Sequence, residues 1–355
     1  MAGLDRDRTP ALFAVTTSVL SGVILAVLTK ALQAGISAGA TVLWSALVSA
    51  VVGGCFWVVL RRRNRSAAVF LMTSAFTQKY YVADLVQQVH SALDRNDLDL
   101  VLRIPDRDYD AGAQAHHLRR ILRRKNAYAG GIIVAGEVLR LRDDLAAFCR
   151  DVRLPVVFSD LEPFPGESEY PPRTAFIGYD TGELGELAGN WLVARLRGKT
   201  APHVLVVASR EHDSRQQRCE KALRAALPDV DVTVVDHCEF MRSRAYHAVR
   251  AHVRQLPEGG CLDAIFATND EMALGAADAL LATPSAATRE TVVVGIDGVL
   301  EARALIDTGG SPLRATVVQD THRLAVGAVD LLVKMHGGHA VPRRTILAAE
   351  LYEAG

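Results

Sequence analysis

The side chains best suited to hold a ligand follow short apolar segments of strand type. They are Asp160 after 154–158, Asn269 after 264–267, Asp297 after 291–296 and Gln319 after 313–318. Gln78, Tyr80 and Tyr81 follow the first such segment after a short loop, and Arg215 and Arg218 lie where the loop after 203–208 enters a helix. The carboxyl ends of parallel strands converge on one cleft, so these side chains are predicted to face a common ligand.

A structural role competes with this interpretation at each position. Asn269 and Asp270 open a helical segment, where either side chain can cap the helix by accepting from free backbone N–H groups. Asp160 and Asp297 can be caps as well, the two tyrosines can be partly buried core, and Gln319 can be a surface residue. Their shared position at strand ends favours a binding site over these alternatives.

The chemistry of the set suits a polyhydroxylated ligand. Each ligand hydroxyl can donate to a carboxylate and accept from an arginine or an amide, and charge-assisted hydrogen bonds are the stronger kind. Tyrosine rings can cover the C–H faces of a sugar. No nucleophile–base pair, G-x-S-x-G elbow or Gly-rich phosphate loop is found in the sequence, so we expect no enzyme activity and no cofactor.

Two further motifs are weaker. Glu211-His212-Asp213 resembles a metal ligand set, but no second cluster supports it, and we expect a solvated loop. The basic segment from Arg119 to Lys125 is suited to phospholipid headgroups or a partner, although a solvated helix face is the simpler expectation.

Composition excludes several functions. The chain has 355 residues and a formal net charge of zero, so no long-range field attracts nucleic acid or an anionic membrane. Its five cysteines form no CxxC pair, which argues against a zinc site and a disulfide framework and fits a reducing compartment.

The first 65 residues predict a membrane anchor. Apart from Lys30, no charged residue occurs between Ala11 and Leu60, and two spans fit at about 11–30 and about 41–60. A cleaved signal peptide is the alternative for the first span, with a long apolar stretch against it. Four arginines within 61–65 predict a multi-pass membrane protein whose soluble part faces the cytoplasm.

After residue 65, apolar segments alternate with helical segments, which predicts βαβ units and two parallel sheets. The expected strands are 67–73, 98–104, 130–135, 154–158, 175–178, 203–208, 230–235, 264–267, 291–296 and 313–318.

Residues 67–355 resemble the type I periplasmic sugar-binding proteins of the ribose-binding kind and the sensor half of lactose-repressor-family regulators. The resemblance rests on 267–276 (ATNDEMALGA), 293–298 (VVGIDG) and 315–319 (ATVVQ). It implies that Asn269, Asp297, Gln319 and Asp160 contact the ligand and that Phe240 packs on it. Arg218 best occupies the place of a ligand arginine, with Arg215 close by.

The sequence departs from the family at four of these positions. Tyr80 and Tyr81 replace a phenylalanine pair, Gln78 replaces an asparagine, and Leu161 stands where ribose binders usually carry arginine. The ligand is therefore not expected to be ribose itself.

The resemblance also implies an α/β fold of two Rossmann-like lobes joined by a hinge. One lobe is about 66–178 plus 320–345, and the other is about 179–319 plus 346–355. The favoured function is a membrane-anchored, cytoplasm-facing sensor that binds a small carbohydrate or similar metabolite and signals to a protein partner by hinge closure. The alternative is an outward-facing solute-binding component of a carbohydrate ABC transporter; a DNA-binding regulator is disfavoured because apolar spans occupy the place of a helix-turn-helix.

Overall fold

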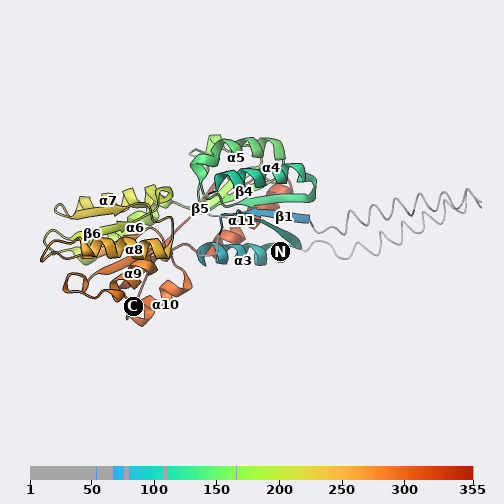
Figure 1. Ribbon diagram of the computed structural model, residues 1–355. Coiled ribbons are helices and arrows are strands. Elements are labelled where there is room, and N and C mark those ends of the chain that lie inside the picture. The colour runs from blue at the N-terminus through green and yellow to red at the C-terminus, as the bar shows by residue number, and fades with distance from the viewer. Residues whose placement is uncertain (1–52, 54–66, 76–79, 107–109, 165, 355) are drawn as a thin grey trace, which may run out of the picture. The chain divides into compact units, whose positions relative to one another are not determined.

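The computed structural model describes residue 53 and residues 67–75, 80–106, 110–164 and 166–354. The chain divides into two compact units, residues 1–66 and 67–355. The description that follows concerns the second unit, which contains two six-stranded sheets, each with helices on both faces (Figure 1).

Lobe 1 is built on a parallel sheet with the order β11-β5-β4-β3-β1-β2. Its strands are β1 (Ala67–Met72), β2 (Leu98–Arg103), β3 (Tyr128–Ile133), β4 (Val156–Ser159), β5 (Thr174–Tyr179) and β11 (Arg344–Leu347). Helices α3 (Tyr80–Asp94) and α11 (Thr321–His336) cover one face, and α4 (Ala111–Arg123) and α5 (Val138–Val152) cover the other. The central strands are apolar along their length because both faces are buried.

Lobe 2 repeats this arrangement with the order β12-β10-β9-β8-β6-β7. Its strands are β6 (His203–Val207), β7 (Asp231–Val235), β8 (Ala264–Ala267), β9 (Val292–Asp297), β10 (Leu313–Val318) and β12 (Glu350–Glu353), the last antiparallel to β10. Helices α6 (Thr181–Leu196) and α7 (Asp213–Ala226) cover one face, and α8 (Arg242–Arg254), α9 (Asp270–Ala282) and α10 (Leu300–Thr308) cover the other. Short 3₁₀ turns lie at Lys125–Ala127, Glu167–Glu169, Arg210–His212 and Ala286–Thr288.

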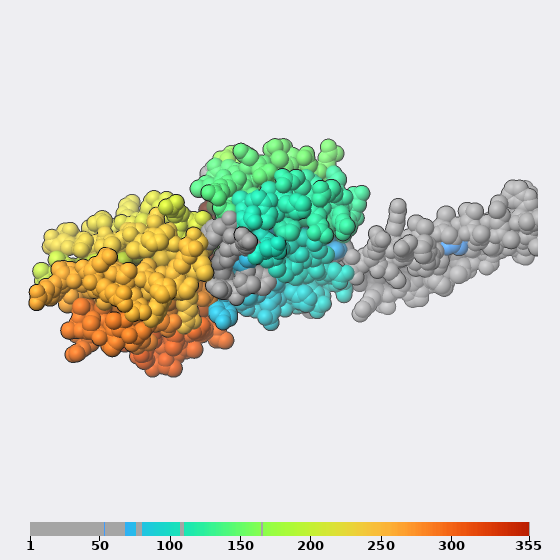
Figure 2. Space-filling model, viewed as in Figure 1, coloured from blue at the N-terminus to red at the C-terminus, as the bar shows by residue number. Residues whose placement is uncertain are grey.

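The chain passes between the lobes three times: after Tyr179, at Gln319–Asp320, and through the two residues between β11 and β12. The Asp320 backbone N–H donates to the Tyr179 hydroxyl at 2.7 Å, which ties the first two crossings together. The sequence placed the first crossing one residue earlier and ended lobe 1 at residue 345, whereas β11 continues in the lobe 1 sheet to Leu347. Lobe 1 is coloured mostly blue to green in the space-filling view, and lobe 2 yellow to orange (Figure 2).

The predicted α/β fold with two lobes and parallel sheets is confirmed. Each of the ten expected strands is present, with ends shifted by at most two residues. Strand β11 was not among them, and β12 lies within 346–355, where the resemblance to the family implied a C-terminal strand in lobe 2. Within the part of the chain that the structure describes, no helix is long and apolar enough to cross a bilayer; the two predicted spans, about 11–30 and about 41–60, lie outside the described residues.

Candidate functional site

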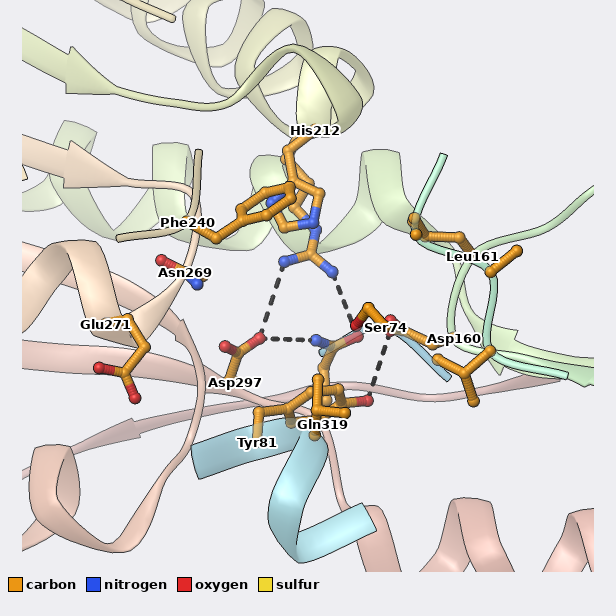
Figure 3. A pocket seen from close by; sticks show the side chains of 15 residues that line it. Ser74, Tyr81, Asp160, Leu161, His212, Phe240, Asn269, Glu271, Asp297 and Gln319 are labelled. Atoms are coloured by element: carbon orange, nitrogen blue, oxygen red, sulfur yellow. Dashed lines mark hydrogen bonds and ion pairs between the residues drawn. The ribbon is translucent and has the colours of Figure 1, made fainter. Parts of the chain in front are cut away.

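A cavity between the two lobes collects most of the side chains that the sequence placed at strand ends (Figure 3). Both sheets have the strand order 2-1-3-4-5 in chain sequence, and their order reverses between β1 and β3 and between β6 and β8. Open α/β sheets bind ligands at such points. The cavity is lined by Ser74, Tyr81, Val82, Val134, Ala135, Gly136, Asp160 and Leu161 of lobe 1, His212, Arg215, Phe240, Asn269, Glu271 and Asp297 of lobe 2, and Gln319 at the second crossing.

The centre of the site is a buried network of Arg215, Asp297 and Gln319. The Gln319 Nε2 group donates to Asp297 Oδ1 at 2.9 Å, and Arg215 Nη2 donates to Gln319 Oε1 at 3.4 Å. Arg215 Nη1 lies 3.7 Å from Asp297 Oδ1, with both side chains almost fully buried. Donors and acceptors are thus held in fixed positions facing the cavity, which favours a ligand rich in hydroxyl groups.

Close helix packing sets the position of Arg215. Gly185 of α6 lies directly against the backbone of Arg215, and a Cβ built at Gly185 would be 2.0 Å from the Arg215 carbonyl oxygen. Only glycine allows this approach, so α7 begins close to the sheet and its first turn reaches the cavity. Arg215 Nη1 also donates to the Thr268 carbonyl at 2.9 Å, which joins the helix to the end of β8.

An imidazole and a phenyl ring form one wall of the cavity. The rings of His212 and Phe240 are tilted against each other with centroids 4.3 Å apart. The Ser209 hydroxyl accepts from the Phe240 backbone N–H at 2.8 Å and positions that ring. His212 Nδ1 lies 3.1 Å from the Thr268 carbonyl, and because a carbonyl can only accept, Nδ1 carries the proton. The expectation of a solvated loop at Glu211-His212-Asp213 was therefore wrong for His212, which is buried.

Asn269 combines the two roles that the sequence left open. Its Oδ1 accepts from the Met272 backbone N–H at 3.0 Å and caps α9. Its side chain also lines the cavity, so the Nδ2 amide is a candidate donor to a ligand. Asp270, one residue later, is a structural residue: it is fully buried, and its Oδ1 and Oδ2 accept from the Thr316 hydroxyl at 2.7 Å and the Val299 N–H at 2.9 Å.

Lobe 1 contributes a tyrosine and a carboxylate. The Tyr81 hydroxyl donates to Asp160 Oδ1 at 3.5 Å, and Leu161 lines the cavity beside it. A hydrogen bond also crosses the cleft between the lobes: the Tyr80 backbone N–H at the start of α3 donates to Glu271 Oε1 at 3.3 Å. Glu271, almost fully buried, is a cavity residue that sequence reasoning missed because it reads as an ordinary helix-opening glutamate.

Three cavity residues have backbone angles that L-residues seldom adopt. Asp160, Phe240 and Asp297 have φ values of 74°, 59° and 125°. Such conformations cost on the order of 1–3 kcal/mol each and concentrate at binding sites. These backbone conformations direct Asp160 and Asp297 at their strand ends, and Phe240 in the loop after β7, toward the cleft.

The electrostatics of the site are dominated by buried carboxylates. Burial raises the pKa of Asp297 well above its ordinary value; Arg215 acts in the opposite direction, while Asp270 and Asp160 raise it further. Burial also raises the pKa of Tyr81, with Asp160 and Asp297 adding to the effect. Proton donors on a ligand would relieve this crowding of negative charge.

Two of the predicted residues that the structure describes, Arg218 and Tyr80, do not have their side chains in the cavity. Arg218 lies over Gly182 of α6 and pairs with Glu186 at 2.9 Å, with both side chains about half exposed. The arginine that the structure places at the site is Arg215, one helical turn earlier. The Tyr80 ring is 62% exposed, and only its backbone participates. Gln78 lies outside the described residues.

The fold and the cavity define a two-lobed ligand-binding protein. A model of the periplasmic binding protein domain matches residues 69–340, and the chain belongs to this family. A Rhizobium meliloti protein assigned as a rhizopine-binding protein is 27% identical over 217 residues, which is 58% of this chain and 66%, slightly under two thirds, of that relative.

Solved structures give the same fold. An ABC transporter solute-binding protein from Actinobacillus succinogenes with bound D-allose superposes with a TM-score of 0.72 at 16% identity, covering 81% of this chain and 98% of that one. A solute-binding protein from Bacillus halodurans with bound myo-inositol gives 0.70 at 18% identity, covering 82% and 96%.

Proposed function

We propose that this chain is a membrane-tethered receptor that binds a small carbohydrate or polyol between its lobes and signals by hinge closure. The observation that carries the proposal is the cavity itself, in which six of the nine predicted ligand residues meet: Tyr81, Asp160, Phe240, Asn269, Asp297 and Gln319. The ligands of the two solved relatives, D-allose and myo-inositol, are both polyhydroxylated, which supports the assignment. No catalytic role is proposed for any of these residues.

Closure follows from the way the site is divided. Asp160 and Tyr81 belong to lobe 1, and Arg215 and Asp297 belong to lobe 2, so a ligand that contacts both sets favours the closed arrangement. A ligand shifts this equilibrium only by its additional affinity for the closed state. The ligand's hydroxyls can form hydrogen bonds with Asp160 and Asp297 at the same time only when the two lobes are close together.

A thermal-unfolding screen tests the ligand class. The purified protein is heated with pentoses, hexoses, inositols and linear polyols at saturating concentration. A ligand at a hundredfold excess over Kd stabilises by about 2.7 kcal/mol, or roughly 5 °C for a domain of this size. Asp297→Ala and Asn269→Ala should abolish the shift, whereas Arg218→Met, outside the cavity, should retain it. A folded protein that no compound stabilises would refute the carbohydrate assignment.

The tether and the cytoplasmic orientation rest on the N-terminal sequence. An impermeant maleimide tests them, because Cys261 is exposed while Cys149, Cys219 and Cys238 are buried. In a Cys55→Ser background, we expect Cys261 to react only after the cells are permeabilised. The protein should stay with the membrane fraction in both cases.

An exported solute-binding component of an ABC importer is the second candidate, favoured by the description of both solved relatives as ABC transporter proteins. It predicts that Cys261 reacts in intact cells. The same labelling experiment therefore separates the two functions.

A further inference from the structure

A basic surface covers part of lobe 1, and its one lysine, Lys125, donates through Nζ to the Asp151 carbonyl at 3.0 Å. Residues 111–136 contain no Asp or Glu, yet Arg119, Arg120, Arg123, Arg124 and Lys125 fall within seven positions. The four arginines are exposed and form no ion pair with any described residue. We call these four arginines and Lys125 the α4 basic face.

The α4 basic face lies on the solvent side of helix α4, because the opposite side of the helix packs in the hydrophobic core. Ala115, Leu118 and Ile121 are buried against the sheet and against α5. The arginines therefore remain on the outer layer of lobe 1, where Figure 1 shows α4. Arginines elsewhere in the molecule do find partners: Arg242 pairs with both Asp278 and Glu301.

Strand pairing places the α4 basic face near the beginning of β1, the first strand of lobe 1. The α4 helix ends at Arg123, a 3₁₀ turn follows at Lys125–Ala127, and β3 begins at Tyr128. Tyr128 is paired with Ala68 of β1, and paired strands are about 4.8 Å apart. The basic end of α4 and the start of β1 thus share one edge of the lobe 1 sheet.

That edge cannot be far from the bilayer if residues 41–60 span it. Only residues 61–66 separate the predicted span from β1, and six residues reach roughly 20 Å at most. Four of those six are arginines. The connecting sequence and the α4 basic face are therefore both positively charged, whereas the formal net charge of the whole chain is zero.

We propose that the α4 basic face binds the headgroups of anionic phospholipids beside the membrane anchor. This inference rests on the proposed tether. A guanidinium fork matches the oxygens of a phosphate, and basic residues near an anionic membrane surface are attracted to it. Because α4 belongs entirely to lobe 1, this contact holds lobe 1 on the membrane and leaves lobe 2 as the moving part during closure.

Arginine modification of the full chain in nanodiscs tests the proposal. Discs are made of phosphatidylcholine alone or with added phosphatidylserine, and phenylglyoxal modification is read by peptide mass spectrometry. In anionic discs, we expect at least a fivefold slower reaction at Arg123 and Arg124, with the effect lost at high salt. The exposed Arg254 and Arg289 of lobe 2 should react equally in both discs.

A pair of variants makes the result specific. Arg123→Glu with Arg124→Glu should remove the protection of Arg119 and Arg120, whereas Arg254→Glu with Arg289→Glu should preserve it. Both pairs should keep the ligand-induced thermal shift.

Three results would overturn the proposal. The first is equal modification of the α4 basic face in both discs by an inserted protein. The second is protection by an added oligonucleotide but not by anionic lipid. The third is failure to co-elute with discs, which would refute the tether as well.

Discussion

Replacing Arg215 with methionine is the sharpest test of the site, because it removes one charge from a buried network and keeps the apolar stem. Asp297 then stays in the cavity without its nearby cation. Loss of one partner from a buried ion pair costs about 3–5 kcal/mol, whereas an exposed pair is worth at most about 1 kcal/mol. Arg218→Met, which breaks the half-exposed pair with Glu186, is the matched control.

The pH dependence of this penalty has a definite sign. The pKa of Asp297 is raised in the folded protein. As the pH rises and this carboxyl ionises, it therefore lowers the free energy of unfolding by an increasing amount. Arg215 opposes that shift, and its loss raises the pKa further. The difference between wild type and Arg215→Met should therefore grow from pH 5 to pH 8. Asp297→Asn in the Arg215→Met background removes the isolated charge and should restore at least half of the loss.

Urea unfolding followed by the fluorescence of Trp191, which is buried in lobe 2, measures these quantities. The reasoning fails if Arg215→Met costs no more than Arg218→Met. It also fails if the penalty is the same at pH 5 and pH 8 and Asp297→Asn does not relieve it.

Three further outcomes are expected. The pKa of Asp270 is raised by burial to about 7 from 3.8, so the free energy of unfolding should fall by about 3 kcal/mol between pH 4 and pH 7. Asp270→Asn should flatten this decline in urea titrations, and an unchanged slope would contradict the shift. Phe240→Ala should weaken ligand binding about tenfold in calorimetry by removing the ring wall, while Phe240→Leu should weaken it less. Glu271→Ala leaves the Tyr80 N–H without its acceptor across the cleft and should lower ligand affinity about fivefold. Glu271→Gln keeps an acceptor oxygen and should bind the ligand nearly as well as wild type. Equal losses of affinity in both variants would argue against a role for this hydrogen bond.

The sheets could be predicted because their strands are short, apolar and separated by helical segments. The same regularity explains why β11 was not among the expected strands. All four residues of β11 are only partly buried, and the strand lies at the edge of its sheet. Its membership depends on pairing with β5, a contact across about 170 residues that leaves no local signal.

The site could be predicted where it follows directly from a strand end, as at Asn269, Asp297 and Gln319. Arg215 and Arg218 could not be separated, because residues three apart lie on nearly the same helix face. What distinguishes them is height along α7, about 4.5 Å, and the close contact with Gly185 that brings the first turn to the cavity. Glu271 gave no signal of its own, and His212 was noticed only as part of a triplet that resembles metal ligands. The burial of both side chains comes from packing that a local motif does not encode.

Gln319 lines the cavity and is also part of the second crossing, which connects the two lobes. Its amide contacts Asp297 and Arg215, and the next residue, Asp320, is bonded to Tyr179 of the first crossing and caps α11. If the lobes close on a ligand as proposed, a substitution at Gln319 that changed which ligand is recognised would also change the balance between open and closed forms. Ligand specificity could then change without altering this balance mainly at cavity positions away from the crossings, such as Phe240 and Leu161, so the crossings restrict which changes of specificity the protein can tolerate.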